Sequence, residues 1–248
     1  MAVVTVVAEG DAFVDTAAGR IASLVQDAIT ARSSAVVCLT GGDTPGPVYE
    51  RLADPRSRVD WPRVHLFWGD ERHVPPDHPE SNFALARRTL LDRVPVPASH
   101  VHRMRGEIKD ANEAAVAYDE EMRIGFSQAG RRSRTFDLVL LGLGQDTHIA
   151  SIFPGTTFPM PTDSDEGPRV AAVWAEHLNA WRITLTPLAL LDARSIVVMV
   201  AGAKKTGAVR AALELPLNVE RWPAQLLRVG GDRVEWILDE RAAENLHS

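Results

Sequence analysis

The clearest candidate for chemistry is His148, which stands two residues after Asp146 in a loop that also contains Gly142, Gly144 and Gly155. Histidine is the usual side chain for moving a proton at neutral pH, because its ordinary pKa is near 6.5. A lone histidine is more often a packing residue, but a glycine-framed loop after an apolar run favours function. We therefore expect His148 to act in proton transfer.

A second loop, Gly69–Pro75, crowds Asp70, Glu71, Arg72 and His73 directly after an apolar segment. Taken alone, such a cluster is typical of a solvated turn with local ion pairs. Its place after a strand favours a functional role, since Asp70 and Arg72 can then face a crevice at the strand end. Arginine suits two-pronged capture of a phosphate or a carboxylate.

Two further segments have the chemistry of anion sites. The turn that contains Gly41 and Gly42 precedes a predicted helix, where free backbone N–H groups attract anions. Lys204 and Lys205 follow another predicted strand at a helix start, and one of them can anchor a phosphate. Neither segment is a P-loop, and no dinucleotide-binding glycine motif occurs, so the sequence does not support nucleotide binding.

The elements that position these loops alternate between strands and helices. Short β-branched runs predict strands, and apolar residues at helical spacing predict helices. The predicted strands are 2–8, 36–39, 64–68, 136–141, 169–174, 182–185, 195–200, 226–229 and 234–238, and the predicted helices are 11–31, 48–52, 82–91, 111–122 and 204–213. Residues 154–168 predict a long surface loop.

This alternation predicts an α/β fold: a single-domain, Rossmann-like architecture over residues 1–248, with a largely parallel sheet and helices on both faces. In open parallel sheets, ligands bind beyond the carboxyl ends of the strands. The polar loops all follow predicted strands, so we expect them to converge on one site.

Composition narrows the possible partners. The formal net charge of −6 argues against a general nucleic-acid binder, which needs a clustered basic excess. No apolar stretch approaches the length of a membrane span, and the N-terminus lacks the basic start of a secretory signal, so we expect a cytoplasmic protein. The one cysteine, Cys38, is expected to be a small buried hydrophobe.

We expect no metal site. His100 and His102 form a His-x-His pair without a carboxylate or thiolate near them in the sequence, which is weak for a metal. His65 lies within a predicted strand, where a hydrogen-bonded core histidine is the simpler interpretation.

The loops in combination resemble the 6-phosphogluconolactonases, within the wider glucosamine-6-phosphate isomerase/deaminase-like superfamily. The resemblance is carried by the ordered segments Leu39–Pro45, Trp68–Arg72 with Val74–Pro75 and Pro79–Asn82, Gly142–Gly155, Arg182–Thr186, and Gly202 with Lys205. Each segment is short and common, but their combination in this order is specific.

The resemblance implies hydrolysis of 6-phospho-D-glucono-1,5-lactone to 6-phospho-D-gluconate, without a metal or organic cofactor. It implies that His148 activates water and that Asp146 or Asp70 orients the imidazole. Arg72 is expected to stabilise the oxyanion. Phosphate and substrate binding are expected from six residues: Gly41, Gly42, Thr44, Asn82, Arg182 and Lys205. We expect a monomer or homodimer that binds a small sugar-phosphate lactone and neither nucleic acid nor membrane.

Two alternatives stay open. The deaminase branch shares the glycine turn and the Asp-x-His segment, but its motif has a carboxylate where this chain has Phe153, and it usually has tyrosine at the place of Arg72. A non-catalytic sugar-phosphate sensor is the other alternative. Sensors of this kind normally carry a DNA-binding segment, and we find no spare N-terminal segment for one.

Three positions depart from the lactonase pattern. Thr147 stands where the family usually has glycine, Ile149 where it has threonine, and Asp43 where it has serine. If the backbone at Thr147 needs a positive φ, a β-branched residue there costs about 1–3 kcal/mol. Asp43 in the glycine turn is unfavourable for direct contact with a phosphate.

Overall fold

The structure is a computed structural model that describes residues 2–158 and 167–247. The predicted surface loop 154–168 is therefore described only at its two ends, and its residues 159–166 lie outside the described part. The strands are β1 (Val3–Val7), β2 (Ala35–Leu39), β3 (Val64–Trp68), β4 (Asp70–Arg72), β5 (Leu138–Leu141), β6 (Val170–Ala175), β7 (Ala180–Leu185), β8 (Ser195–Val200) and β9 (Val234–Asp239).

Six strands form one parallel sheet in the order β1-β9-β8-β5-β2-β3. Its central strands β2 and β5 are buried along their whole length, as expected for runs of β-branched and aliphatic residues covered on both faces. The predicted α/β class with a largely parallel sheet is confirmed.

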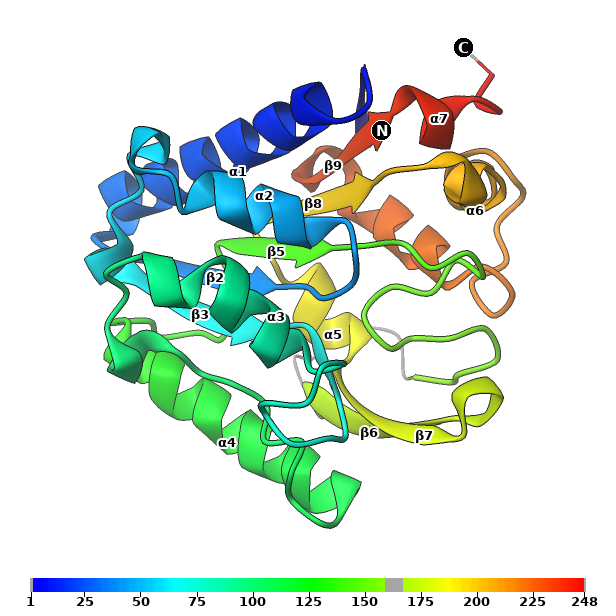
Figure 1. Ribbon diagram of the computed structural model, residues 1–248. Helices are drawn as coiled ribbons and strands as arrows, with labels where there is room; N and C mark the ends of the chain where they lie inside the picture. The colour runs from blue at the N-terminus through cyan, green and yellow to red at the C-terminus, as the bar shows by residue number, and fades with distance from the viewer. Residues whose placement is uncertain (1, 159–166, 248) are drawn as a thin grey trace.

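Helices cover both sides of this sheet. They are α1 (Asp11–Arg32), α2 (Pro45–Leu52), α3 (Asn82–Thr89), α4 (Ala111–Gln128), α5 (Pro187–Leu191), α6 (Thr206–Leu213) and α7 (Glu240–Ala243). In Figure 1, α1 and α2 lie above the sheet and α4 and α5 below it. No helix in the two described ranges is long and apolar enough to cross a membrane.

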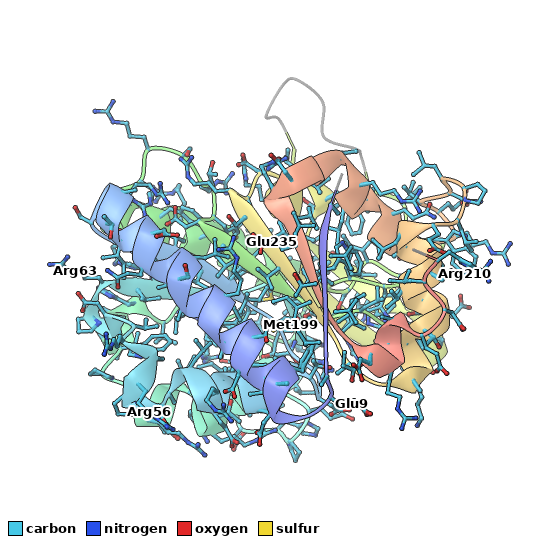
Figure 2. The ribbon with its side chains drawn as sticks, turned by 90° about the horizontal axis from the view of Figure 1, so that it is seen from above. Glu9, Arg56, Arg63, Met199, Arg210 and Glu235 are labelled. Atoms are coloured by element: carbon cyan, nitrogen blue, oxygen red, sulfur yellow. The ribbon has the colours of Figure 1, made fainter. Side chains whose placement is uncertain are left out.

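Helix α1 is fixed to the sheet by an apolar stripe and an ion pair. Phe13, Ile21 and Val25 recur at helical spacing and are buried against the core. Arg20, on the same helix, pairs with Glu235 of β9, which Figure 2 labels beside α1. Together these contacts hold the helix across β2, β8 and β9.

A second, three-stranded antiparallel sheet in the order β4-β7-β6 was not predicted. The expected loop after Trp68 is instead strand β4, because the chain turns away from the large sheet and pairs with β7. The Leu185 N–H donates to the Gly69 carbonyl at 2.8 Å, which continues this ladder. Asp70 thereby lies opposite Thr184.

The predicted strand 226–229 is wrong. These residues lie within the 3₁₀-helical segment Pro223–Arg233. Leu226 and Leu227 are buried, so the apolar run reflects packing rather than pairing in a sheet. Gly231, with φ 57°, interrupts the segment before β9 begins.

The parallel arrangement brings the polar loops to one edge. In Figure 1 the arrows of β5 and β8 point the same way, toward the loop that follows β5 and toward α6. The glycine turn after β2 and the chain after β3 leave the sheet at this same edge, because all six strands run in one direction.

Candidate active site

A cavity of about 150 Å³ opens at the carboxyl edge of the large sheet. It is lined by Thr40, Gly41, Gly42, Asp43, Thr44, Pro45, Asp70, Arg72, Asn82, Gly142, Leu143, Gly144, His148, Ala150 and Lys205. Of the residues expected at the site, only Asp146 and Arg182 do not line it. Four loops that are distant in sequence thus surround one space.

Asp146 is the carboxylate that contacts the imidazole. Its Oδ1 is 2.6 Å from Nδ1 of His148 and also accepts the backbone N–H of His148 at 3.2 Å. Half-burial by itself raises the pKa of Asp146, but the hydrogen bonds and positive charge of His148 outweigh it and lower that pKa to about 2. Asp146 is therefore ionised at neutral pH and accepts the Nδ1 proton.

The turn that carries this pair is held by the backbone of Gly144. Its N–H donates to the His148 carbonyl at 2.9 Å, and its own carbonyl accepts the Thr147 N–H at 3.0 Å. A Cβ at Gly144 would overlap Nδ1 of His148 and Oδ1 of Asp146. Only glycine leaves room for the carboxylate–imidazole pair.

Asp70 has a different environment. Its Oδ1 accepts from Nδ2 of Asn82 at 3.1 Å, and its Oδ2 accepts from Oγ of Ser151 at 2.6 Å. The backbone N–H of Ser151 donates in turn to Oγ1 of Thr184. Asp70 is thus a buried carboxylate held by neutral donors at the cavity wall. Sequence reasoning missed Ser151 and Thr184, although Ser151 is a polar residue in the apolar run after His148.

Glu71 organises the start of α3. Its buried carboxylate accepts the backbone N–H of Asn82 at 2.7 Å and of Phe83 at 2.8 Å, and the hydroxyl of Ser81 at 3.0 Å. Burial raises the pKa of Glu71, against the opposing effect of these backbone donors. The side chain fixes Asn82 where it meets Asp70, a role that no sequence motif indicated.

Arg72 and Arg182 are neighbours across the β4–β7 ladder. Arg72 lines the cavity and donates to the Glu80 carbonyl. The pKa of Arg182 is lowered by burial and by the positive charge of Arg72, while Asp70 opposes the change. Two guanidinium groups side by side favour an anion in front of them.

Lys205 is the lysine at the cavity; Lys204 is exposed. Its Nζ donates to the Leu143 carbonyl at 2.6 Å. Burial lowers the pKa of Lys205, and the negative charges of Asp146 and Asp43 act in the opposite direction. Through its hydrogen bond to Leu143, the ammonium group is held by the same loop that carries the imidazole.

The glycine turn approaches Asn82 closely. A Cβ at Gly41 would overlap the Asn82 carboxamide, and Gly42 has φ 97°, a conformation that glycine adopts freely. Thr44 is the N-cap of α2 and is followed by Pro45, but the Thr44 side chain makes no capping hydrogen bond. At Gly41 and Gly42 the turn therefore presents only backbone to the cavity.

Both tyrosines of the chain anchor strand ends beside the site. The Tyr49 hydroxyl accepts the N–H of Thr40 and donates to its carbonyl, at 2.9 and 2.8 Å. The Tyr118 hydroxyl does the same for Trp68, at 2.8 and 3.0 Å. Each hydroxyl satisfies backbone groups where the chain leaves the sheet, which fixes the start of the two loops.

The departure at Thr147 has the expected structural consequence. Its φ is 71°, in the region that disfavours β-branched residues, and its buried Oγ1 has no hydrogen-bond partner within the described chain. Ile149 is buried in the core.

None of the other histidines lines the cavity. His65 is buried and its Nδ1 is 3.2 Å from Nε2 of His102, whose Nδ1 contacts Glu121 at 2.8 Å. The carboxylate near His102 comes from α4, which is why the sequence around His102 does not show it. Within residues 2–158 and 167–247, no cluster of three or more histidine, cysteine or acidic side chains has an arrangement that could hold a metal ion.

Residues 8–236 match the family described as glucosamine-6-phosphate isomerases/6-phosphogluconolactonase. This chain belongs to that family. A 6-phosphogluconolactonase from Synechocystis sp. is 38% identical over 222 residues, which cover 90% of this chain and 89% of the relative.

Solved structures of the glucosamine-6-phosphate isomerase/6-phosphogluconolactonase family share the fold. The 6-phosphogluconolactonase from Trypanosoma brucei superimposes with a TM-score of 0.83 at 28% identity, covering 100% of this chain and 99% of the other. A monomeric glucosamine-6-phosphate deaminase has a TM-score of 0.81 at 21% identity, covering 98% and 99%. Because both activities occur on this fold, the residues of the site must distinguish them.

Proposed function

We propose that this protein hydrolyses 6-phospho-D-glucono-1,5-lactone to 6-phospho-D-gluconate, with His148 as the general base. The observation that carries the proposal is the Asp146–His148 pair at the wall of a cavity that also contains Arg72 and Lys205. The similarity to a 6-phosphogluconolactonase over most of the chain supports the same substrate.

The reaction needs a proton acceptor, an oxyanion site and a proton donor. Nδ1 of His148 faces Asp146, so Nε2 is the nitrogen available to take a proton from water as the water attacks the lactone carbonyl. Arg72 and backbone N–H groups stabilise the negative charge that develops on the carbonyl oxygen. When the ring C–O bond breaks, the imidazolium returns the proton to the departing ring oxygen. Asp146 stabilises the imidazolium between these two steps.

The phosphate end of the substrate is held by cations and by backbone. Lys205 lies at the cavity, and Arg182 lies beside Arg72 across the ladder. Gly41 and Gly42 bring backbone to the wall without side-chain bulk. The acidic side chain of Asp43 lines the same cavity, so we assign the phosphate to the cations and not to that end of the turn.

Phe153 favours hydrolysis over deamination. It stands where the deaminase motif has a carboxylate, and its ring centroid is 4.8 Å from that of His148. A phenyl group cannot relay a proton. At this position the imidazole therefore lacks the carboxylate partner that isomerisation and ammonia release by a deaminase require.

Fresh 6-phosphogluconolactone and glucosamine 6-phosphate as parallel substrates test the assignment. We expect the lactone to give 6-phosphogluconate, which a coupled dehydrogenase assay detects. We expect glucosamine 6-phosphate to give no ammonia. His148→Ala should lower kcat by at least about 100-fold. Ammonia release would assign the deaminase activity, and tight binding of sugar phosphate without turnover would favour a sensor.

We further propose that the enzyme acts as a single domain in the cytoplasm, as a monomer or homodimer, without a cofactor. The net charge of −6 argues against binding of nucleic acid, which needs a clustered basic excess.

A further inference from the structure

We propose that Phe153 is a positioning residue that holds the imidazole of His148 so that Nε2 faces the cavity. The inference rests on the proposed role of His148 as the base. Phe153 does not line the cavity and is 6% exposed, so it does not itself contact a substrate there.

The contact between the two rings is direct. Their centroids are 4.8 Å apart at an interplanar angle of 52°, and the hydrogen bond from Nδ1 to Asp146 constrains the imidazole at a second point. One hydrogen bond fixes a ring nitrogen but leaves the ring plane free to swing about it. A bulky neighbour against the ring removes that freedom, and together the two contacts define where Nε2 points.

The local chain path brings Phe153 back onto the histidine. Ile149 and Ile152 form an isolated antiparallel bridge, and Ala150 between them has φ 48°. This tight reversal places the side chain five residues after His148 against the imidazole. Ile149 and Ile152, the two residues that form the bridge, are both buried, and this packing holds the strained backbone at Ala150.

Phe153 is supported from behind by a small separate apolar cluster. It packs with Val173 and Ala175 of β6, and with the partly buried Phe158. The ring of His177, in the β6–β7 connection, lies 4.9 Å from the Phe153 ring in an edge-on arrangement. The antiparallel sheet therefore serves as a rigid backing for the imidazole, which gives this unpredicted sheet a role in the site.

The physical consequence is selective loss of turnover when the ring is removed. Without Phe153 the imidazole can rotate or exchange its tautomer with water, so the base is misaligned for part of the time. Lys205 and Arg182, which are proposed to bind the phosphate, lie on other elements of the fold. Substrate affinity should therefore be unaffected. We expect Phe153→Ala to lower kcat about 10-fold with KM within twofold, and Phe153→Leu, which keeps apolar bulk, to fall in between.

The test combines kinetics with a spectroscopic readout. In wild type, the long-range ¹H–¹⁵N spectrum of neutral His148 should show one tautomer with the proton on Nδ1, and in Phe153→Ala an average of two. Phe126→Leu is the matched control, because it removes a buried phenyl ring that packs on Phe67 and Phe136 in the main core; its kcat and spectrum should match wild type. If Phe153→Ala does not fold, the same kinetics and spectra are measured on Phe153→Leu.

The proposal is overturned if folded Phe153→Ala, or Phe153→Leu where alanine does not fold, retains the turnover of Phe126→Leu or a single Nδ1–H tautomer. His148→Ala separates this failure from that of the proposed function. If His148→Ala is inactive while the Phe153 variants are normal, only the positioning role fails. If His148→Ala is fully active, the proposed base itself is wrong.

Discussion

Asp146 and His148 form a hydrogen bond of 2.6 Å inside a single turn, so the orienting carboxylate and the imidazole belong to the same loop. Because Asp146 is ionised at neutral pH, it selects the tautomer of His148 that carries the proton on Nδ1. In the neutral form of the ring, Nε2 then carries no proton and is the nitrogen that can act as a base.

Replacing Asp146 by asparagine should lower kcat about 100-fold, because a carboxamide neither selects this tautomer nor stabilises the imidazolium. The coupled dehydrogenase assay measures the effect. Asp43→Asn is the control for removing a negative charge from the same region, and it should change kcat by less than about 5-fold. Equal losses in the two variants would show that charge, and not the contact with His148, matters.

Gly144→Ala should reduce kcat by about 100-fold, since a Cβ there overlaps both members of the Asp146–His148 pair. Gly207 in α6 has open space around its Cα, so Gly207→Ala should leave activity and folding intact. Circular dichroism distinguishes a displaced pair from a misfolded chain. Wild-type turnover in Gly144→Ala would mean that the loop relaxes without disturbing the base.

Thr147→Gly should raise the free energy of unfolding by about 1 kcal/mol. The change relieves a β-branched residue at φ 71° and removes a buried, unpartnered hydroxyl, partly offset by the greater entropy of glycine in the unfolded chain. Urea denaturation measures it. Ser33, which follows α1, has φ 66°, so Ser33→Gly reports the relief of backbone strain alone. It should raise the free energy of unfolding by less than Thr147→Gly. A less stable Thr147→Gly protein would contradict the strain argument.

The buried histidine pair predicts a loss of stability in mild acid. Burial, reinforced by His100 and His102, lowers the pKa of His65 to about 4, and burial also lowers that of His102. Unfolded histidines titrate near 6.5, so between these values the unfolded chain binds more protons and stability falls as the pH falls. His65 alone should account for roughly 2 kcal/mol between pH 6.5 and 4.

Urea denaturation at several pH values between 4 and 7 measures this dependence. His65→Phe keeps an aromatic ring against His100 but cannot titrate, so its stability should vary less with pH. A pH dependence identical to that of wild type would assign the effect to other groups.

The parallel sheet followed from local sequence patterns. The runs at β2, β3, β5 and β8 are short, mainly apolar and contain at least one β-branched residue each, a pattern that predicts buried strands. An apolar run alone does not show whether it pairs with another strand, and for this reason 226–229 was wrongly predicted as a strand. The leucines of this run are buried within a 3₁₀-helical segment instead.

The sequence by itself determined which residue types stand at the strand ends, and with them the histidine, the acids, the arginines and the glycine turn of the site. Only the tertiary structure decided which of them touch: Asp146 rather than Asp70 on His148, Lys205 rather than Lys204 at the cavity, Phe153 behind the imidazole. Contacts of this kind depend on chain reversals and on an antiparallel sheet formed by distant segments. Those arrangements are set by packing and backbone hydrogen bonds across the whole molecule, which no local pattern encodes.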